Sequence, residues 1–166
     1  NAMSDTDRKA RAEKALSEKP DGVVEAIASA ADVTPAEILA ILPKGAATVT
    51  AADHFGEIWS ELGTWGDVLL IVHTPDIVAE VTGRLPARPE GHGWSHIHGH
   101  SPSGGHIRKE RCTAIAFIDR AFHGRRSCSI WFMNGDGAAM FKIFVRRDAA
   151  RELDAAQLGK FEALKA

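Results

Sequence analysis

The sequence predicts a single α+β domain, with small helices near the N-terminus, an antiparallel meander of strands, and one closing helix. Three observations predict this order. Residues 21–62 contain short apolar patterns at helical spacing, residues 68–145 contain runs of β-branched and aromatic residues, and residues 154–164 return to helical spacing. The chain has 166 residues, 45% of them hydrophobic, which suits one domain with one core.

The chain is expected to divide into three parts. Residues 1–3 look like an expression scar that ends in the native initiator, and they are excluded from the fold. Residues 4–20 predict a polar helix with a thin apolar stripe, which we expect at the periphery. Residues 21–166 are expected to form the single α+β domain.

Start signals define the two small helices that follow. Asp21 is the expected N-cap of the first of them. Thr34, Pro35 and Glu37 predict the second, because a threonine cap followed three residues later by a glutamate makes a capping box. Two short helices joined by a turn resemble a DNA-binding helix-turn-helix, but residues 21–42 contain four acidic residues and no lysine or arginine. Since a recognition helix must approach phosphates, the pair is predicted to serve packing instead.

The remaining elements follow from apolar spacing and turn residues. Residues 53–62 predict an amphipathic helix, and residues 154–164 predict another. The inner face of the first is expected to consist of Phe55, Ile58, Trp59 and Leu62. Strands are predicted at residues 47–49, 68–73, 77–84, 113–122, 127–133 and 139–145. The sequence Asn-Gly-Asp-Gly at 134–137 is typical of a hairpin turn.

Nothing in the sequence predicts export or membrane insertion. The longest apolar run, residues 68–72, is far shorter than the about 18 residues of a membrane helix. The charged start of the chain is followed by no apolar signal segment, so a cytoplasmic location is expected. Cys112 and Cys128 are accordingly expected to be reduced and buried, with thiolate ligation of iron as the alternative.

Charge is unevenly distributed along the chain. The formal net charge of −2 argues against nonspecific binding of nucleic acid. Residues 106–147 nevertheless contain nine Lys and Arg against three Asp and Glu, so this segment carries +6 and the rest of the chain −8. Two interpretations stay open: an anionic ligand, or basic side chains spread over both faces of a sheet.

Histidines and glycines concentrate between Gly91 and Arg108, where we expect any chemistry of the protein to lie. The histidines of this segment are His92, His96, His98, His100 and His106. If residues 94–100 are extended, the histidines at 96, 98 and 100 point to the same side, because side chains alternate along a strand.

Several kinds of site fit such a row of imidazoles. One is a divalent-metal site with an open position. A cupin site is excluded, because Pro102 and Ser103 stand where its glutamate belongs. The histidine-triad nucleotide hydrolase pattern fits poorly, since Gly99 and Ser101 occupy apolar positions of that motif. A haem site and a solvated loop with locally bonded histidines complete the alternatives.

The haem interpretation uses more of the segment than the others do. Histidine is a common axial ligand, and glycines let backbone approach a flat macrocycle. Arg108 can pair with a propionate, because the guanidinium fork fits a carboxylate. The apolar rim is expected from Trp94, Ile97, Trp131, Phe132 and Met133. The sequence has no nucleophile elbow and no phosphate-binding loop, so no catalytic residue is assigned.

Whole segments of the chain resemble the haem-utilisation carrier family called HutX or ChuX. The matching segments are Gly-His-Ser-Pro-Ser-Gly-Gly-His-Ile-Arg at 99–108, Cys-Thr-Ala-Ile-Ala-Phe-Ile at 112–118, Phe-Met-Asn-Gly-Asp-Gly-Ala-Ala-Met-Phe-Lys-Ile at 132–143, and Arg-Asp at 147–148. The resemblance covers about residues 20–165. It implies a HemS/ChuX-like fold, related to one repeat of the two-repeat HemS/ChuS haem proteins, and a homodimeric cytosolic haem carrier.

The resemblance also implies a set of site residues. It places His96, His98, His106 and Arg108 in the haem site. Within that site we expect His98 or His106 as the iron ligand, and Trp94 and Ile97 against the ring. Several members of the family carry a tyrosine just ahead of the His-x-His region, and it can ligate the iron. Trp94 stands near that place here and the chain contains no tyrosine, so histidine or cysteine must ligate instead.

The predicted function is therefore a cytosolic haem-binding carrier in haem and iron utilisation, rather than an enzyme. Its expected partners are haem and a second copy of the chain, with no nucleic acid and no membrane insertion. Two alternatives stay open. One is a haem-degrading enzyme, and the other is a family member that has lost haem and binds another anionic ligand, or a metal.

Overall fold

The computed structural model describes residues 4–86, 95–97 and 104–166, and for residues 95–97 it describes the backbone alone. The helices are α1 (Asp5–Glu18), α2 (Val24–Ala31), α3 (Pro35–Ala40), α4 (Phe55–Leu62) and α5 (Ala155–Lys165), with short 3-10 helices η1 (Ala52–His54) and η2 (Lys109–Arg111). The strands are β1 (Ala47–Ala51), β2 (Asp67–His73), β3 (Val78–Arg84), β4 (Ser95–Ile97), β5 (Gly105–Ile107), β6 (Cys112–Phe122), β7 (Arg125–Asn134) and β8 (Ala139–Phe144).

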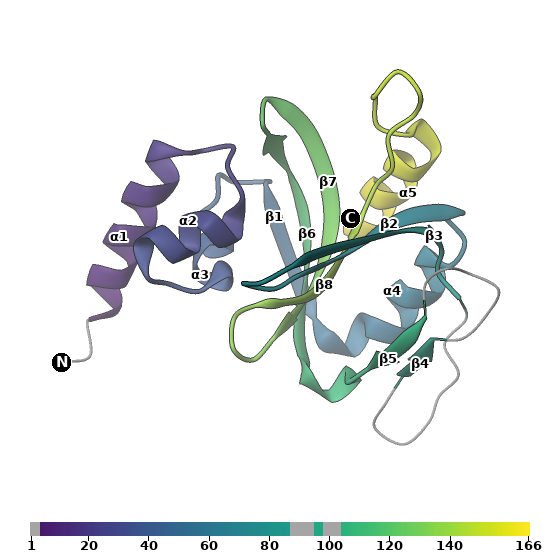
Figure 1. Cartoon of the computed structure of the whole chain (residues 1–166), viewed down its shortest axis with the longest axis horizontal. Coiled ribbons are helices and arrows are strands. Elements are labelled where there is room, and N and C mark those ends of the chain that lie inside the picture. The colour runs from purple at the N-terminus through teal and green to yellow at the C-terminus, as the bar shows by residue number, and fades with distance from the viewer. Residues whose placement is uncertain (1–3, 87–94, 98–103) are drawn as a thin grey trace.

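Six of the strands form one antiparallel sheet in the order β1-β6-β7-β8-β2-β3. The helices α1, α2 and α3 lie on one side of this sheet, and α4 and α5 lie on the other (Figure 1). β4 and β5 form a separate two-stranded ribbon. Small helices, an antiparallel sheet and a closing helix confirm the predicted α+β class. Among the described residues, no helix is long and apolar enough to cross a membrane.

The two faces of the sheet bury two hydrophobic clusters, which we call the large core and the small core. The large core lies against α4 and α5, and the small core lies against α1, α2 and α3. The pair Ile115–Phe132 of β6 and β7 belongs to the large core, and the next pair, Ala116–Trp131, belongs to the small core. This alternation follows from the two-residue period of a strand.

The helix α4 confirms its predicted inner face. The four side chains at Phe55, Ile58, Trp59 and Leu62 are all at most 3% exposed. The ring of Phe55 stacks against that of Trp59 and meets Phe132 of β7 edge-on. Burial of these aromatic and aliphatic groups fixes α4 on the central strands of the sheet.

The burial of the central strand β7 contradicts one part of the expected haem site, its apolar rim. Trp131, Phe132 and Met133 were expected at an apolar rim, but all three are at most 5% exposed. Phe132 belongs to the large core, and Trp131 and Met133 belong to the small core. A central strand with both faces covered by helices has no side chain left to line an open site, so this expectation is wrong.

The N-terminal helices confirm one expected cap and correct another. The Thr34 side chain accepts a hydrogen bond from the backbone N–H of Glu37, and the Glu37 side chain accepts one from the backbone N–H of Thr34, which completes the capping box. The helix α2 is preceded by Val23 and has no side-chain cap, so the Asp21 cap is wrong. Arg120 of β6 instead donates to the carbonyl oxygens of Pro20 and Gly22 and holds this segment on the sheet.

The contribution of the N-terminal helices to stability should depend on pH. Arg8 of α1 donates two hydrogen bonds to the Glu37 carboxylate, at 2.6 and 3.0 Å, and this contact lowers the pKa of Glu37 to about 2. A carboxylate whose pKa is lowered by folding stabilises the protein above its unfolded pKa of about 4.3, and this contribution is lost as pH falls toward the folded pKa. The stability difference between wild type and Glu37→Gln should therefore shrink between pH 5 and pH 2, approximately, in urea titrations.

The matched control for this pH dependence is Glu13→Gln. The Glu13 carboxylate lies 3.9 Å from Lys9 at an exposed position, where an ion pair contributes little. The stability difference between Glu13→Gln and wild type should stay small over the whole pH range of the titrations. A Glu37→Gln difference that does not change with pH would contradict the assignment.

The turn between β7 and β8 is fixed by a glycine that touches α3. Gly137 has φ +79°, and a Cβ atom built on it lies 2.7 Å from Cβ and Oγ1 of Thr34. Gly137→Ala should therefore destabilise the fold by about 2–4 kcal/mol, because it combines backbone strain with a clash at the α3 cap. Urea unfolding measures this loss. Gly135→Ala is the control, since its Cβ meets only Thr113 Cγ2 at 3.6 Å, and equal losses at both positions would argue against the mechanism.

Candidate functional site

The β4–β5 ribbon places two histidine positions opposite each other. The antiparallel register pairs His96 with His106, Ile97 with Gly105, and Ser95 with Ile107. Directly opposed residues in such a pair have Cα atoms about 4.5–5.5 Å apart. Two of the predicted site residues, of which His106 is a candidate iron ligand, are ten apart in the sequence and are thus brought together by the fold.

The strand β5 is anchored by one side chain and presents its neighbour to solvent. Ile107 is 9% exposed and belongs to the large core, whereas His106 is exposed. Because side chains alternate along a strand, burial of Ile107 sets the outward direction of His106. Gly105 has φ +144°, a conformation that favours glycine, so the residue before His106 is required by the backbone path.

Positive charge follows directly on β5. Arg108 is exposed, and η2 adds Lys109 and Arg111, which are exposed as well. Arg111 Nη2 lies 2.9 Å from the carboxylate of Asp136 in the β7–β8 turn, which ties η2 to the main sheet. The basic stretch therefore has a fixed place beside His106.

The chain enters the site region from the end of β3, next to α4. Leu85 is buried in the large core, and Trp59 Nε1 of α4 donates a 3.0 Å hydrogen bond to the carbonyl oxygen of Pro86. The same core thus holds both the segment that leads toward residue 87 and, through Ile107, the strand that leads away from residue 104.

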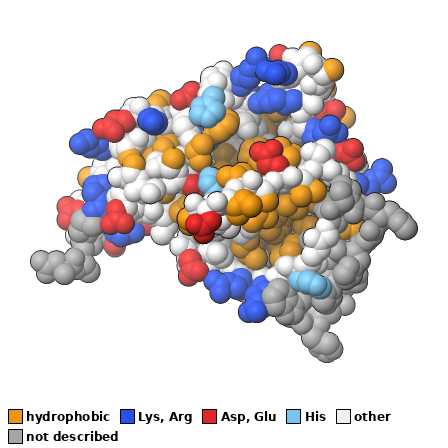
Figure 2. All heavy atoms as spheres, viewed as in Figure 1, with side chains coloured by type: hydrophobic (Ala, Val, Ile, Leu, Met, Phe, Trp, Pro, Cys, Tyr) orange, Lys and Arg blue, Asp and Glu red, His pale blue; other side chains and the backbone are white. Residues whose placement is uncertain are grey.

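An apolar surface lies on this face of the molecule. Figure 2 shows hydrophobic side chains gathered in a hollow beside α4 and the strands β8, β2 and β3. Three hydrophobic side chains of these strands pack on the large core and stay partly exposed: Leu70 and Val72 of β2 and Met140 of β8. Such a surface suits the flat face of an apolar ligand.

The predicted site residues divide into three groups. His106 and Arg108 are described in full and lie within three residues of each other on β5 and the turn after it. His96 and Ile97 are placed by their backbone on β4, opposite β5. Trp94 and His98 lie outside the described residues, so their roles stay predictions.

Of the other histidines, those the structure describes have local partners. His54 Nδ1 lies 3.2 Å from Glu57, and His73 Nδ1 lies 3.5 Å from Glu25. His123 sits in the β6–β7 turn with its ring 4.1 Å from that of Phe122. Within the described part of the chain, no three histidine, cysteine, aspartate or glutamate side chains gather as a metal site.

The cysteines confirm their predicted state. Cys112 and Cys128 are free thiols, and both are buried. Burial raises the pKa of both, that of Cys128 to about 12, where Asp119 adds to the effect. Since the thiolate is the form that binds iron, both cysteines are poorly suited to ligate it. Of the two ligand types expected from the sequence, histidine and cysteine, histidine is therefore the better suited.

The strand β5 is not predicted by the sequence patterns. A three-residue strand is too short to show periodicity, and Gly104 and Gly105 favour a loop. One signal could have indicated this strand. In the sequence Gly-His-Ile at 105–107, a polar residue is followed by an apolar one, and a charged turn comes next.

Comparison with known proteins identifies the family of this chain. The family model for haem utilisation ChuX/HutX matches residues 48–164. The protein named intracellular heme transport protein HutX, from Vibrio cholerae, is 28% identical over 151 residues, which are 90% of this chain and 78% of HutX.

Solved structures agree with this match. A protein from Agrobacterium tumefaciens is 60% identical with a TM-score of 0.91, over 99% of this chain and 97% of its own. The structure described as the heme binding protein ChuX is 38% identical with a TM-score of 0.83, over 93% of this chain and 96% of its own. The heme degrading enzyme ChuS of Escherichia coli is 17% identical with a TM-score of 0.76 over 47% of its length, which shows a shared fold alone. The chain therefore belongs to the ChuX/HutX haem-utilisation family.

Proposed function

We propose that this protein is a cytosolic haem-binding carrier that works as a homodimer. The observation that carries the proposal is the pairing of His96 with His106 on a ribbon anchored by Ile107, in a chain of the ChuX/HutX family. The names of its relatives HutX and ChuX, heme transport protein and heme binding protein, agree with it.

The site supplies the chemistry that haem binding requires. His106 is exposed and offers an imidazole to iron, and His98 is the second candidate ligand. Arg108, two residues on, carries the guanidinium for a propionate. The apolar hollow beside α4 and β2 (Figure 2) is the surface that we propose for the face of the ring. Trp94 and Ile97 stay predicted ring contacts.

A hemin titration of the purified protein at neutral pH tests the proposal. A saturable, shifted Soret band at one haem per chain or per dimer is the expected result. A spectrum that stays that of free hemin would refute it. It would direct the search to the metals and other anions that the histidine-rich segment also suits.

Two further measurements separate carrier from enzyme and test the dimer. A carrier should keep its Soret band when ascorbate is added with catalase present, whereas an enzyme would lose it and leave a bilin-like product. Light scattering after size-exclusion chromatography should give twice the chain mass of 17.9 kDa. A monomer that binds haem would refute the proposed homodimer but would still agree with the proposed carrier function.

A further inference from the structure

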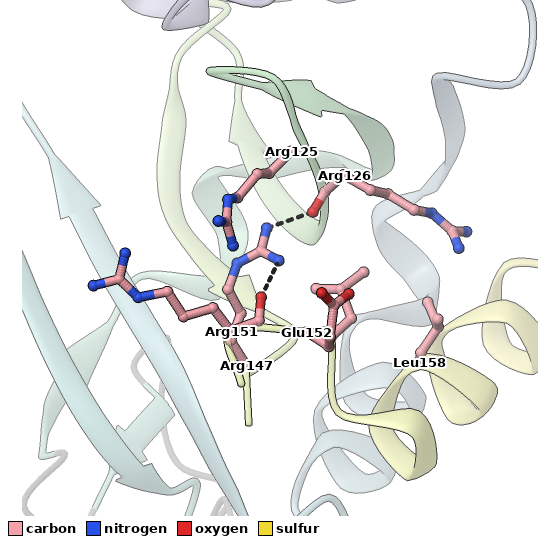
Figure 3. Close-up of a pocket in the computed structure, with 7 residues that line it drawn as sticks. Arg125, Arg126, Arg147, Arg151, Glu152 and Leu158 are labelled. Carbon is pink, nitrogen blue, oxygen red and sulfur yellow. Dashed lines mark hydrogen bonds between the residues drawn. The ribbon is translucent and has the colours of Figure 1, made fainter. Parts of the chain in front are cut away.

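A second concave site lies at the other end of the molecule, away from the β4–β5 ribbon. It is a cavity of about 360 Å3 between the start of β7 and the segment that leads into α5. Its lining residues are Arg125, Arg126, Arg147, Arg151, Glu152, Leu153 and Leu158 (Figure 3). Four of these lining residues are arginines, and the haem proposal uses none of them.

The arginines differ in how they are held. Arg126 turns away from the cavity and pairs with Asp119 at 2.8 Å and Glu162 at 3.2 Å, so its charge is neutralised. Arg147 donates to the backbone carbonyl oxygens of Arg151, at 3.1 Å, and of Arg126. These two bonds fix its guanidinium at the centre of the group in Figure 3 and leave further N–H donors unused, because a guanidinium has five.

The other two arginines have no acidic partner among the described residues. Arg125 is exposed at the start of β7, and its guanidinium lies beside that of Arg147 in Figure 3. Arg151 is exposed in the loop before α5, with φ +64°. Like charges that gather around one volume repel each other, and a bound anion relieves that repulsion.

The loop that carries Arg151 is preorganised. The Asp148 carboxylate accepts hydrogen bonds from the backbone N–H groups of Ala150 and Glu152, at 2.8 and 3.0 Å. The backbone N–H of Asp148 donates to the carbonyl oxygen of Glu152 at 2.7 Å, and Arg147 forms a β-bridge with Leu153. A binding group on such a loop loses little entropy when a ligand arrives.

We infer that this cavity, which we call the arginine pocket, binds a phosphate dianion, either free or as a monoester. The charges of Arg125, Arg147 and Arg151 exceed that of Glu152 by two, which matches a dianion. Guanidinium groups pair with phosphate oxygens through parallel N–H donors, and a tetrahedral anion offers oxygens in several directions at once. The anionic ligand suggested by the basic segment 106–147 thus has a place that is separate from the haem site.

The test is a calorimetric titration of the full chain with inorganic phosphate, in chloride buffer at constant ionic strength. Arg151→Gly is the sharpest variant, because glycine removes the guanidinium and also suits the positive φ. We expect Arg151→Gly and Arg125→Ala each to weaken phosphate binding about tenfold or more while the melting temperature without phosphate is kept. Arg147 is not substituted, because its guanidinium donates hydrogen bonds to two backbone carbonyl oxygens and has a structural role as well.

Arg146→Ala is the matched control. It removes one charge at the neighbouring position, where Arg146 lies 3.7 Å from Asp67 and lines a different cavity. It should leave phosphate affinity unchanged. Equal losses in all three variants, tighter binding of succinate than of phosphate, or no saturable phosphate binding would each overturn the inference. Comparing the affinities for glycerol phosphate and for inorganic phosphate then shows whether the ligand is a monoester or the free anion. The variants should also give unchanged hemin titrations, which separates this test from the haem proposal.

Discussion

Replacing His98 and His106 together by alanine should abolish the shifted Soret band of the haem complex. The chain has no tyrosine, and its cysteines are buried with raised pKa values, so the proposed haem site takes its axial ligand from histidine. Loss of a partner that merely orients a metal ligand costs about 10–100-fold in affinity, and loss of the ligand itself costs more. Hemin titrations followed by absorbance measure the effect, and the two single variants show which histidine ligates.

Three variants serve as controls for this experiment. His54→Ala removes an exposed imidazole that pairs with Glu57, and Cys112→Ala and Cys128→Ala remove the buried thiols. All three should retain the wild-type spectrum. If the double histidine variant keeps wild-type affinity, the ligand assignment is wrong, and a cysteine variant that loses the band would name the ligand instead.

Glu25→Ala should produce the largest loss of stability among single substitutions near the N-terminal helices. Lys142 of β8 is 5% exposed, and its ammonium pairs with the Glu25 carboxylate of α2 and lies 3.6 Å from the ring centre of Trp131. Burial lowers the pKa of Lys142, and Glu25 opposes that shift. Without Glu25 the buried ammonium loses its counter-charge, which costs about 3–5 kcal/mol of unfolding free energy in urea titrations.

The double variant Glu25→Leu with Lys142→Met separates this mechanism from simple loss of packing. An apolar pair of similar volume carries no buried charge, so most of the lost stability should return. The exposed carboxylate of Glu13 gives the matched control, and Glu13→Ala should change stability by less than about 0.5 kcal/mol. Glu25→Ala with wild-type stability would show that Lys142 does not depend on its partner.

The sequence by itself determined the local parts of this fold. The capping box at Thr34 and Glu37 and the inner face of α4 depend on contacts between residues three or four apart. The Asn134–Gly137 turn likewise depends on its own side chains, since Asn134 Oδ1 accepts from the backbone N–H groups of Asp136 and Ala138. Patterns of this range can be recognised in one sequence, and so can the segments that carry the family resemblance.

Tertiary structure decided what depends on distant partners. The β4–β5 register that joins His96 and His106 and the burial of Trp131 under α2 and α3 follow from the packing of the whole sheet. The arginines are another example: Arg120 donates to backbone carbonyl oxygens of the segment before α2, whereas Arg125, Arg147 and Arg151, which come from separate segments, line one cavity. The physical reason is that strand register, long-range charge pairing and membership of a site depend on side chains that folding brings together from distant segments, and local spacing does not encode them.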